Sequence, residues 1–148
     1  MPLAEKIDED LKGAMRAGER LKLDTLRMAK SALKYRQIEK GAPLSDEEAL
    51  SVLSTLVKQR KDSVEQYRKA GRDDLAQKEE DEIGVLRAYM PEELSPEELD
   101  ALIAEAIEES GAKGPQDMGK VMKVLMPKVK GTADGKLVNE KVKEALSR

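Results

Sequence analysis

Only three of the 148 residues are aromatic, all of them tyrosine, and the chain has no phenylalanine and no tryptophan. A core for this chain must therefore be built from leucine, isoleucine, valine, methionine and alanine. Such a composition favours α-helices. No segment shows the alternation of apolar and polar residues that marks a half-buried strand. The sequence therefore predicts an all-α protein.

The first two predicted helices are separated by Gly18. Apolar residues recur at helical spacing from Leu3 up to this glycine, and a second helix follows over about 19–40. The second helix has apolar residues on two opposite sides, which predicts a central position in a bundle with both sides covered. One side consists of Leu26, Ala29 and Leu33, and the other of Leu21, Met28, Ala32 and Tyr35.

The third and fourth predicted helices have clear boundaries. Ser45 followed by Glu48 forms a capping box that starts the third helix, and Gly71 ends it. The fourth helix must end before Pro91. Its acidic run over 79–82 is expected to face mostly outward, because such runs are usually solvated helix faces.

Two prolines mark a domain boundary. A continuing helix cannot contain both Pro91 and Pro96. Ser95 and Glu98 form a second capping box, with Pro96 at the first helical position. The sequence thus predicts a four-helix N-terminal domain followed by a three-helix C-terminal domain, over residues 1–91 and 95–148.

Three short apolar stripes are predicted to form the C-terminal domain. The first of them stops at Gly111 and Gly114. Pro127 is expected to end or kink the second helix of this domain. Each stripe is too short to exclude water alone, so the three helices must pack against one another.

The composition excludes several kinds of site. The chain has no cysteine and no histidine, which removes thiol nucleophiles, disulfides, Cys/His zinc sites and imidazole acid–base chemistry. It also has no glycine-rich phosphate loop, so we expect neither catalysis by the isolated chain nor a metal or cofactor. The longest uncharged run, 49–57, is far too short to span a membrane, and the N-terminus lacks a targeting pattern. A cytoplasmic protein without membrane contact is expected.

Charge is distributed unevenly along the chain. Residues 73–110 carry fourteen acidic and two basic side chains, whereas residues 111–148 carry nine basic and four acidic ones. In the latter region lysines surround a glycine-containing turn over 131–135, where a polyanion could bind. The lysines could equally form a solvated rim and the glycines an ordinary turn. A second basic stripe, which could meet RNA, a protein or the acidic fourth helix, consists of Arg20, Arg27 and Lys34.

Three short motifs follow one another in the C-terminal part: GKVMK over 119–123, KGTADG over 130–135 and VN over 138–139. They resemble the GatB tail domain of glutamine-dependent tRNA amidotransferases. With the helical segment over 43–95, the chain from 1 to 148 is still more similar to the small YqeY family. One departure is that Leu125 to Lys128 lengthen the spacer between the motifs. Another is Gly135, which stands where the GatB tail often has proline, so the turn is expected to differ in shape.

The resemblance implies a non-catalytic, tRNA-binding accessory protein that contacts the tRNA elbow, with an amidotransferase or synthetase complex as a further partner. A carbon–nitrogen ligase description would then apply only by homology. Because aromatic platforms are lacking, recognition of RNA backbone and shape is expected. By resemblance, the RNA-binding residues are Gly119, Lys120, Lys123, Lys130, Gly131, Gly135 and Lys136. Charge alone adds Lys113 and Lys128. The alternative is a helical protein-interaction adaptor whose acidic 73–110 region meets a basic partner.

Overall fold

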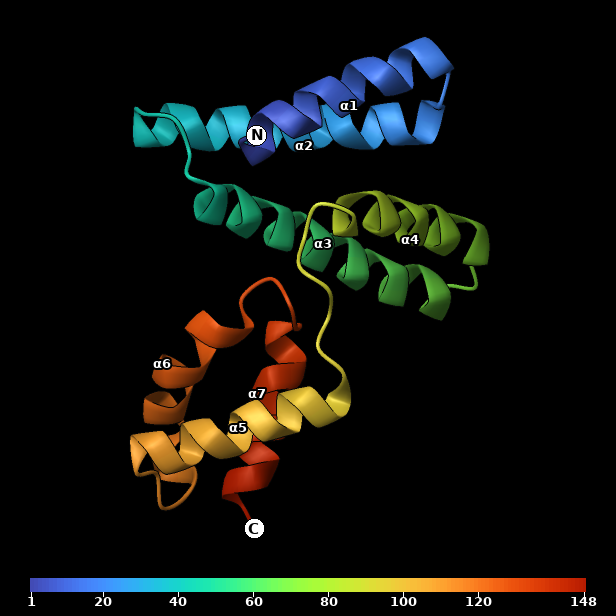
Figure 1. Ribbon diagram of the computed structural model, residues 1–148. Helices are drawn as coiled ribbons and strands as arrows, with labels where there is room; N and C mark the ends of the chain where they lie inside the picture. The colour runs from blue at the N-terminus through green and yellow to red at the C-terminus, as the bar shows by residue number, and fades with distance from the viewer. The chain divides into compact units, whose positions relative to one another are not determined.

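The computed structural model describes all residues from 1 to 148, and every regular element in it is helical, as expected (Figure 1). The helices fall into two compact units, residues 1–91 and 92–148, which are described separately below. None of the helices combines the length and the apolar character that crossing a bilayer requires.

The N-terminal unit consists of two helical hairpins. Helix α1 (Leu3–Ala17) runs antiparallel to α2 (Arg20–Lys40), and α3 (Asp46–Lys69) runs antiparallel to α4 (Asp73–Arg87) (Figure 1). Both turns contain glycine in the left-handed region, with φ of 70° at Gly18 and 72° at Gly71. A side chain at such positions would be strained, so glycine allows each chain reversal.

The capping box predicted for α3 is present. The hydroxyl of Ser45 accepts a hydrogen bond from the Glu48 backbone N–H at 3.1 Å, and the Glu48 carboxylate accepts one from the Ser45 N–H at 3.2 Å. Lys40, at the end of α2, also donates to this carboxylate. The box therefore fixes the start of α3 next to the end of α2.

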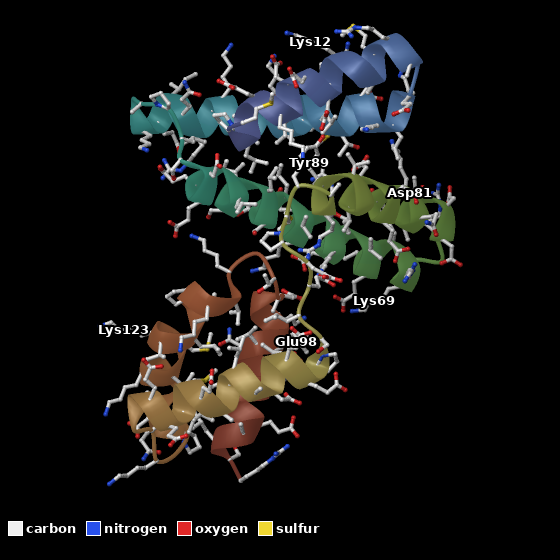
Figure 2. All side chains as sticks on the ribbon, viewed as in Figure 1. Lys12, Lys69, Asp81, Tyr89, Glu98 and Lys123 are labelled. Carbon is white, nitrogen blue, oxygen red and sulfur yellow. The ribbon has the colours of Figure 1, made fainter.

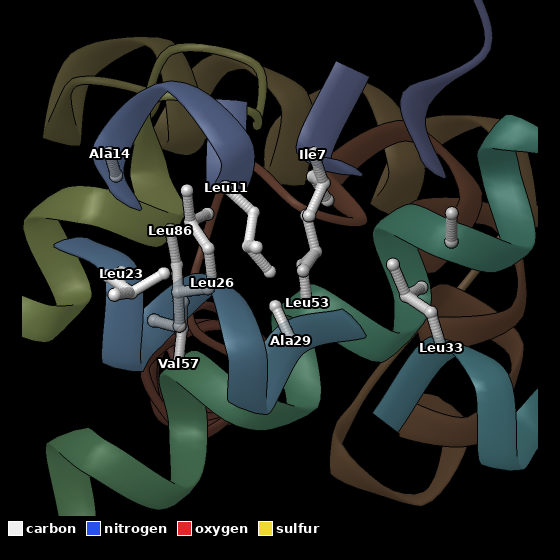
Figure 3. Packing of buried hydrophobic residues seen from close by; sticks show 11 residues of the cluster. Ile7, Leu11, Ala14, Leu23, Leu26, Ala29, Leu33, Leu53, Val57 and Leu86 are labelled. Carbon is white, nitrogen blue, oxygen red and sulfur yellow. The ribbon is translucent and has the colours of Figure 1, made fainter. Parts of the chain in front are cut away.

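Aliphatic side chains from all four helices form the core of the N-terminal unit. Ile7, Leu26, Leu53 and Leu86 come one from each helix and are almost completely buried (Figure 3). Alanines such as Ala29 allow the helices to approach closely between these larger side chains. No aromatic ring contributes a fully buried side chain.

Helix α2 differs from the prediction, because only one of its two apolar sides is covered. Leu26, Ala29 and Leu33 lie in the core, whereas Met28 is 51% exposed and Tyr35 69% exposed. Helices α1, α3 and α4 pack against α2, but no helix covers the side that carries Met28 and Tyr35. Helix α2 therefore contacts all three other helices, as its predicted central position requires, but the expectation that both of its apolar sides are covered is wrong.

The acidic run of α4 also differs from the prediction at one residue. The side chain of Glu82 is only 13% exposed and accepts a hydrogen bond from Nε of Arg60 at 2.9 Å. Arg60 on α3 is itself only 6% exposed at its side chain. Glu80 forms an exposed ion pair with Arg68, as expected of a solvated face. The outward orientation predicted for the whole run therefore fails at Glu82, which lies on the side of α4 that packs against α3.

The C-terminal unit consists of α5 (Pro96–Ser110), a 3-10 turn (Pro115–Asp117), α6 (Met118–Val129) and α7 (Gly135–Leu146). Its core consists of side chains from α5, α6 and α7, as the short stripes predicted. The largest fully buried members are Leu99, Val121, Leu125, Val129, Val138 and Val142.

Two local features define the ends of helices in this unit. Ser95 and Glu98 form the second capping box, with Pro96 at the start of α5. Pro127, in contrast, lies inside α6, which continues to Val129 instead of ending at the proline. The backbone N–H of Leu94 donates to the carbonyl of Thr132 at 2.9 Å, which joins the segment before α5 to the turn after α6.

Candidate binding surfaces

The predicted RNA-binding lysines lie on the surface of the C-terminal unit. Lys123 projects from α6 away from the core (Figure 2) and, like Lys130 and Lys136, is exposed without an ion-pair partner. Lys128 donates to Glu109 of α5 at 2.9 Å, and this hydrogen bond raises the pKa of the Lys128 ammonium. Lys120 lies 3.6 Å from the carboxylate of Asp117. Lys120 and Lys128 thus already form ion pairs with acidic side chains of the same unit.

Lys113 interacts with Asp117 through its backbone N–H as well as through its charge. Its N–H donates to Oδ2 of Asp117 at 3.0 Å. This hydrogen bond, together with the charges of Lys120 and Lys113, holds the pKa of Asp117 below its usual value. The start of α6 is therefore a mixed acidic and basic site.

The turn between α6 and α7 brings together only part of the predicted set. Lys130 and Lys136 flank it, and Gly131 adopts a left-handed φ of 80°. Asp134 caps α7 by accepting from the Lys136 N–H at 3.3 Å. Lys120 lies ten residues before Lys130 along the helix, which corresponds to about 15 Å at a rise of 1.5 Å per residue. The lysines therefore spread along the length of α6.

The glycines of this surface have different structural roles. Only Gly131 needs glycine for its backbone conformation. Gly119 and Gly135 lie within helices, and a Cβ at either position would meet open space. Neither is required for packing.

The second basic stripe lies on α2 and does not pair with α4. Arg20 and Arg27 both approach the carboxylate of Asp24 on their own helix, at 3.5 and 3.9 Å. Lys34 is exposed and has no ion-pair partner. Internal pairing with the acidic fourth helix, one of the predicted alternatives, is therefore absent.

The same exposed side of α2 carries Leu21, Met28 and Tyr35, which the sequence interpretation placed on a covered side, and Ile38, which it did not consider. We call this set the apolar row; Leu21 is 36% exposed, Met28 51%, Tyr35 69% and Ile38 70%. The half-buried Ala32 lies between Met28 and Tyr35 at helical spacing. No sequence signal distinguished this side from the core side, since the buried Leu23 also lies between two charged residues, Lys22 and Asp24.

Met28 connects the apolar row to the buried arginine. Nη2 of Arg60 donates to Sδ of Met28 at 3.4 Å, and Nη1 donates to the Leu56 carbonyl at 3.1 Å. A cavity of about 260 Å³, lined by Met28, Arg60, Glu79 and Glu82 among others, opens beside this contact. The hydrogen bond from Arg60 therefore helps to fix the side-chain conformation of Met28, although half of this side chain is exposed.

A further cavity of about 430 Å³ lies near the end of α4. Its wall includes Tyr89, whose hydroxyl donates to Oδ2 of Asp10 at 2.6 Å, and Lys6, whose ammonium lies 5.7 Å from the tyrosine ring centre. Burial and the Asp10 carboxylate raise the pKa of Tyr89. These contacts fasten the end of α4 to α1.

Comparison with known proteins shows the family and a group of fungal relatives. Residues 4–146 match the Yqey-like protein family. A protein of Pyrenophora tritici-repentis named "Altered inheritance of mitochondria protein 41, mitochondrial" is 30% identical over 95% of the chain and 79% of its own length. A protein of the same name from Vanderwaltozyma polyspora is 38% identical over 66% of the chain and 54% of its own length. An uncharacterised protein of Schizosaccharomyces pombe is 36% identical over 60% of the chain and 72% of its own length.

These names overturn two expectations. The relatives are named for the inheritance of mitochondria, not for tRNA binding or an amidotransferase, so the tRNA-binding accessory function and the carbon–nitrogen ligase description are contradicted. The cytoplasmic location is contradicted as well, because the same relatives are named as mitochondrial proteins. Motifs shared with the amidotransferase tail were therefore a poor guide to function, since a surface turn and a helix stripe can be retained as structure alone.

The family assignment itself agrees with the motifs. The match covers nearly the whole chain and includes both compact units. The chain belongs to the Yqey-like protein family.

Proposed function

We propose that this protein is a non-catalytic helical adaptor, which binds a partner protein through the apolar row of α2. The observation that carries the proposal is the exposure of Met28, Tyr35 and Ile38 on α2, whose opposite side is buried from Leu23 to Leu33. Large apolar side chains that lie together on a surface, rather than scattered singly, are typical of interaction sites.

The types of residue in the row also favour binding to a protein. Tyrosine contributes a large contact area at a small cost in conformational entropy and is enriched among the residues that dominate binding energy. Methionine adapts its shape to a partner surface.

The non-catalytic part of the proposal rests on side-chain chemistry. The chain has no cysteine or histidine, and its buried ion pair, Arg60 with Glu82, is engaged in holding helices together. Purified protein is expected to show neither glutamine hydrolysis nor ATP turnover. Turnover that persists through further purification, and is lost on changing one carboxylate, would contradict this part.

We further infer that the adaptor has two domains that fold independently, a four-helix domain over residues 1–91 and a three-helix domain over residues 95–148. Each compact unit has its own cluster of buried aliphatic side chains. A protein-binding α2 in the first domain leaves the second free for a separate contact.

Site-specific photo-crosslinking in cells of the source organism tests the adaptor function. A photoreactive residue placed at Ser31, an exposed position beside Met28 and Tyr35, is expected to give a discrete adduct. The same residue at Lys58, an exposed position on α3, is the control. The adduct should disappear in a Met28→Asp, Tyr35→Asp variant whose helicity is unchanged. An adduct that survives these changes, or that forms equally from Lys58, would contradict the proposal.

A further inference from the structure

We infer that the partner segment bound by the apolar row is an acidic amphipathic helix of a different protein. This inference rests on the proposed adaptor function and specifies its partner. Three observations support it. Two concern α2, namely the spacing of the apolar row and the charges beside it. The third is that no acidic helix of the chain exposes large apolar side chains that could pack against this row.

The spacing of the row suits a helix as the partner. Leu21, Met28 and Tyr35 are seven residues apart, and Ile38 follows three residues later, so they lie along one side of α2. From Leu21 to Ile38 the row extends about 25 Å at 1.5 Å per residue. A second helix packed along α2 would place its own apolar residues against such a row at heptad spacing. A partner helix of about 18 residues or more would cover it.

The charges beside the row favour an acidic partner. Helix α2 carries seven lysines and arginines but only two acidic residues. Arg20 and Arg27 share a single carboxylate, that of Asp24, and Lys34 between Arg27 and Ile38 has none. Carboxylates on the flank of a partner helix would therefore meet the unpaired Lys34 and the two arginines that share one carboxylate.

A second copy of this chain does not fit the row. Two α2 helices placed face to face would bring the Arg20, Arg27 and Lys34 stripes of both copies, each with the single carboxylate of Asp24, to the same interface. The acidic helices of the chain, α4 and α5, have the right charge but expose no large apolar side chain. Neither can fill the apolar row, so the partner helix must come from another protein.

The probe for this inference is a synthetic 21-residue helix with leucines at heptad spacing and glutamates on both flanks. One control peptide keeps the leucines and replaces each glutamate by lysine. A second control has the acidic composition but distributes the leucines around the helix. Titration of full-length, isotope-labelled protein is followed by NMR. The acidic amphipathic peptide is expected to shift resonances of α2 and to bind more weakly as salt rises, whereas both controls should bind at least about tenfold more weakly.

Charge-reversal variants separate the contribution of charge from that of the apolar row. Arg27→Glu with Lys34→Glu should weaken binding of the acidic peptide at least about tenfold and strengthen binding of the lysine peptide. The matched control, Lys58→Glu with Lys78→Glu, makes the same charge change at exposed positions on α3 and α4 and should leave binding unchanged. Met28→Asp with Tyr35→Asp should abolish binding.

The outcomes distinguish this inference from the proposed function. If Ser31 gives its discrete adduct but the acidic peptide binds no better than the lysine peptide, the adaptor function stands and the acidic partner is overturned. If analytical ultracentrifugation shows self-association that the Met28→Asp, Tyr35→Asp variant loses, the partner is a second copy and the inference is wrong. If neither the adduct nor peptide binding is found, both proposals fail.

Discussion

The guanidinium of Arg60 joins three helices of the N-terminal unit. From α3 it donates to Glu82 of α4 at 2.9 Å, to the Leu56 carbonyl at 3.1 Å and to Met28 of α2 at 3.4 Å. A buried charge is costly unless it is paired and hydrogen-bonded. The three contacts satisfy this requirement while fixing how α2, α3 and α4 meet.

Glu82→Ala is expected to lower the free energy of unfolding by about 3 kcal/mol, because it leaves the buried Arg60 charge without its partner. Urea denaturation followed by circular dichroism would measure the change. The control is Glu80→Ala, which breaks the exposed Arg68–Glu80 pair and should cost less than about 1 kcal/mol.

Replacing both members of the buried pair tests the cause of the loss. Arg60→Met with Glu82→Leu removes both charges and should recover most of the stability lost in Glu82→Ala. Equal loss in the single and double variants would show that hydrogen bonds to Leu56 and Met28, and not the unpaired charge, account for the effect.

At the scale of the element, α3 depends on its capping box. Hydrogen bonds from the Lys40 ammonium, and then from Ser45, lower the pKa of Glu48 from 4.5 to about 2. Ionised Glu48 is thus preferred in the folded state, so it stabilises α3 fully above pH 4.5 and loses this effect as pH falls towards 2.

Glu48→Gln is therefore expected to reduce the loss of stability between pH 4.5 and 2. The measurement is the urea midpoint of the protein and the variant across this range. Lys40→Met removes the strongest cause of the lowered pKa and should flatten the pH dependence in the same way. A pH dependence unchanged in both variants would contradict the role assigned to this carboxylate.

Helix boundaries were predictable because their causes are local. Ser45, Ser95 and the left-handed glycines act within a few residues of the ends that they define. Which apolar side of α2 is covered could not be predicted. Apolar spacing indicates which residues share a face, but not whether another helix packs against that face. Burial of Glu82 was missed for the same reason, since its partner Arg60 lies 22 residues away on another helix.

For the candidate binding surfaces, too, the sequence predicted which residues share a face but not which contacts they make. Surface positions for Lys123, Lys130 and Lys136 followed from the stripe pattern of α6 and α7. The acidic partners of Lys120 and Lys128 depend on helix packing or on the turn before α6 and could not be anticipated. The apolar row was visible in the sequence as a set of residues, but only the fold shows that it is exposed.

At the scale of the whole molecule, each compact unit has its own aliphatic core. Fragments 1–91 and 92–148 are expected to be helical when expressed separately. The longer one should unfold cooperatively on heating, whereas the shorter one should be less stable because small domains bury less of their surface. Limited proteolysis of the full chain should cut first between Met90 and Pro96. A protease-resistant core that runs continuously through residues 80–105 would contradict this division.

The hydrogen bond between Tyr89 and Asp10 has a consequence for synthesis on the ribosome. It joins residues 79 positions apart, so the N-terminal unit cannot complete its contacts until the end of α4 has emerged. Residues 90–110, which include α5, need about 1–4 s to follow at 5–20 residues per second. Helical units dominated by local contacts fold in microseconds to milliseconds. The basic stripe of α2 is therefore expected to be formed before the acidic helix α5 has left the ribosome.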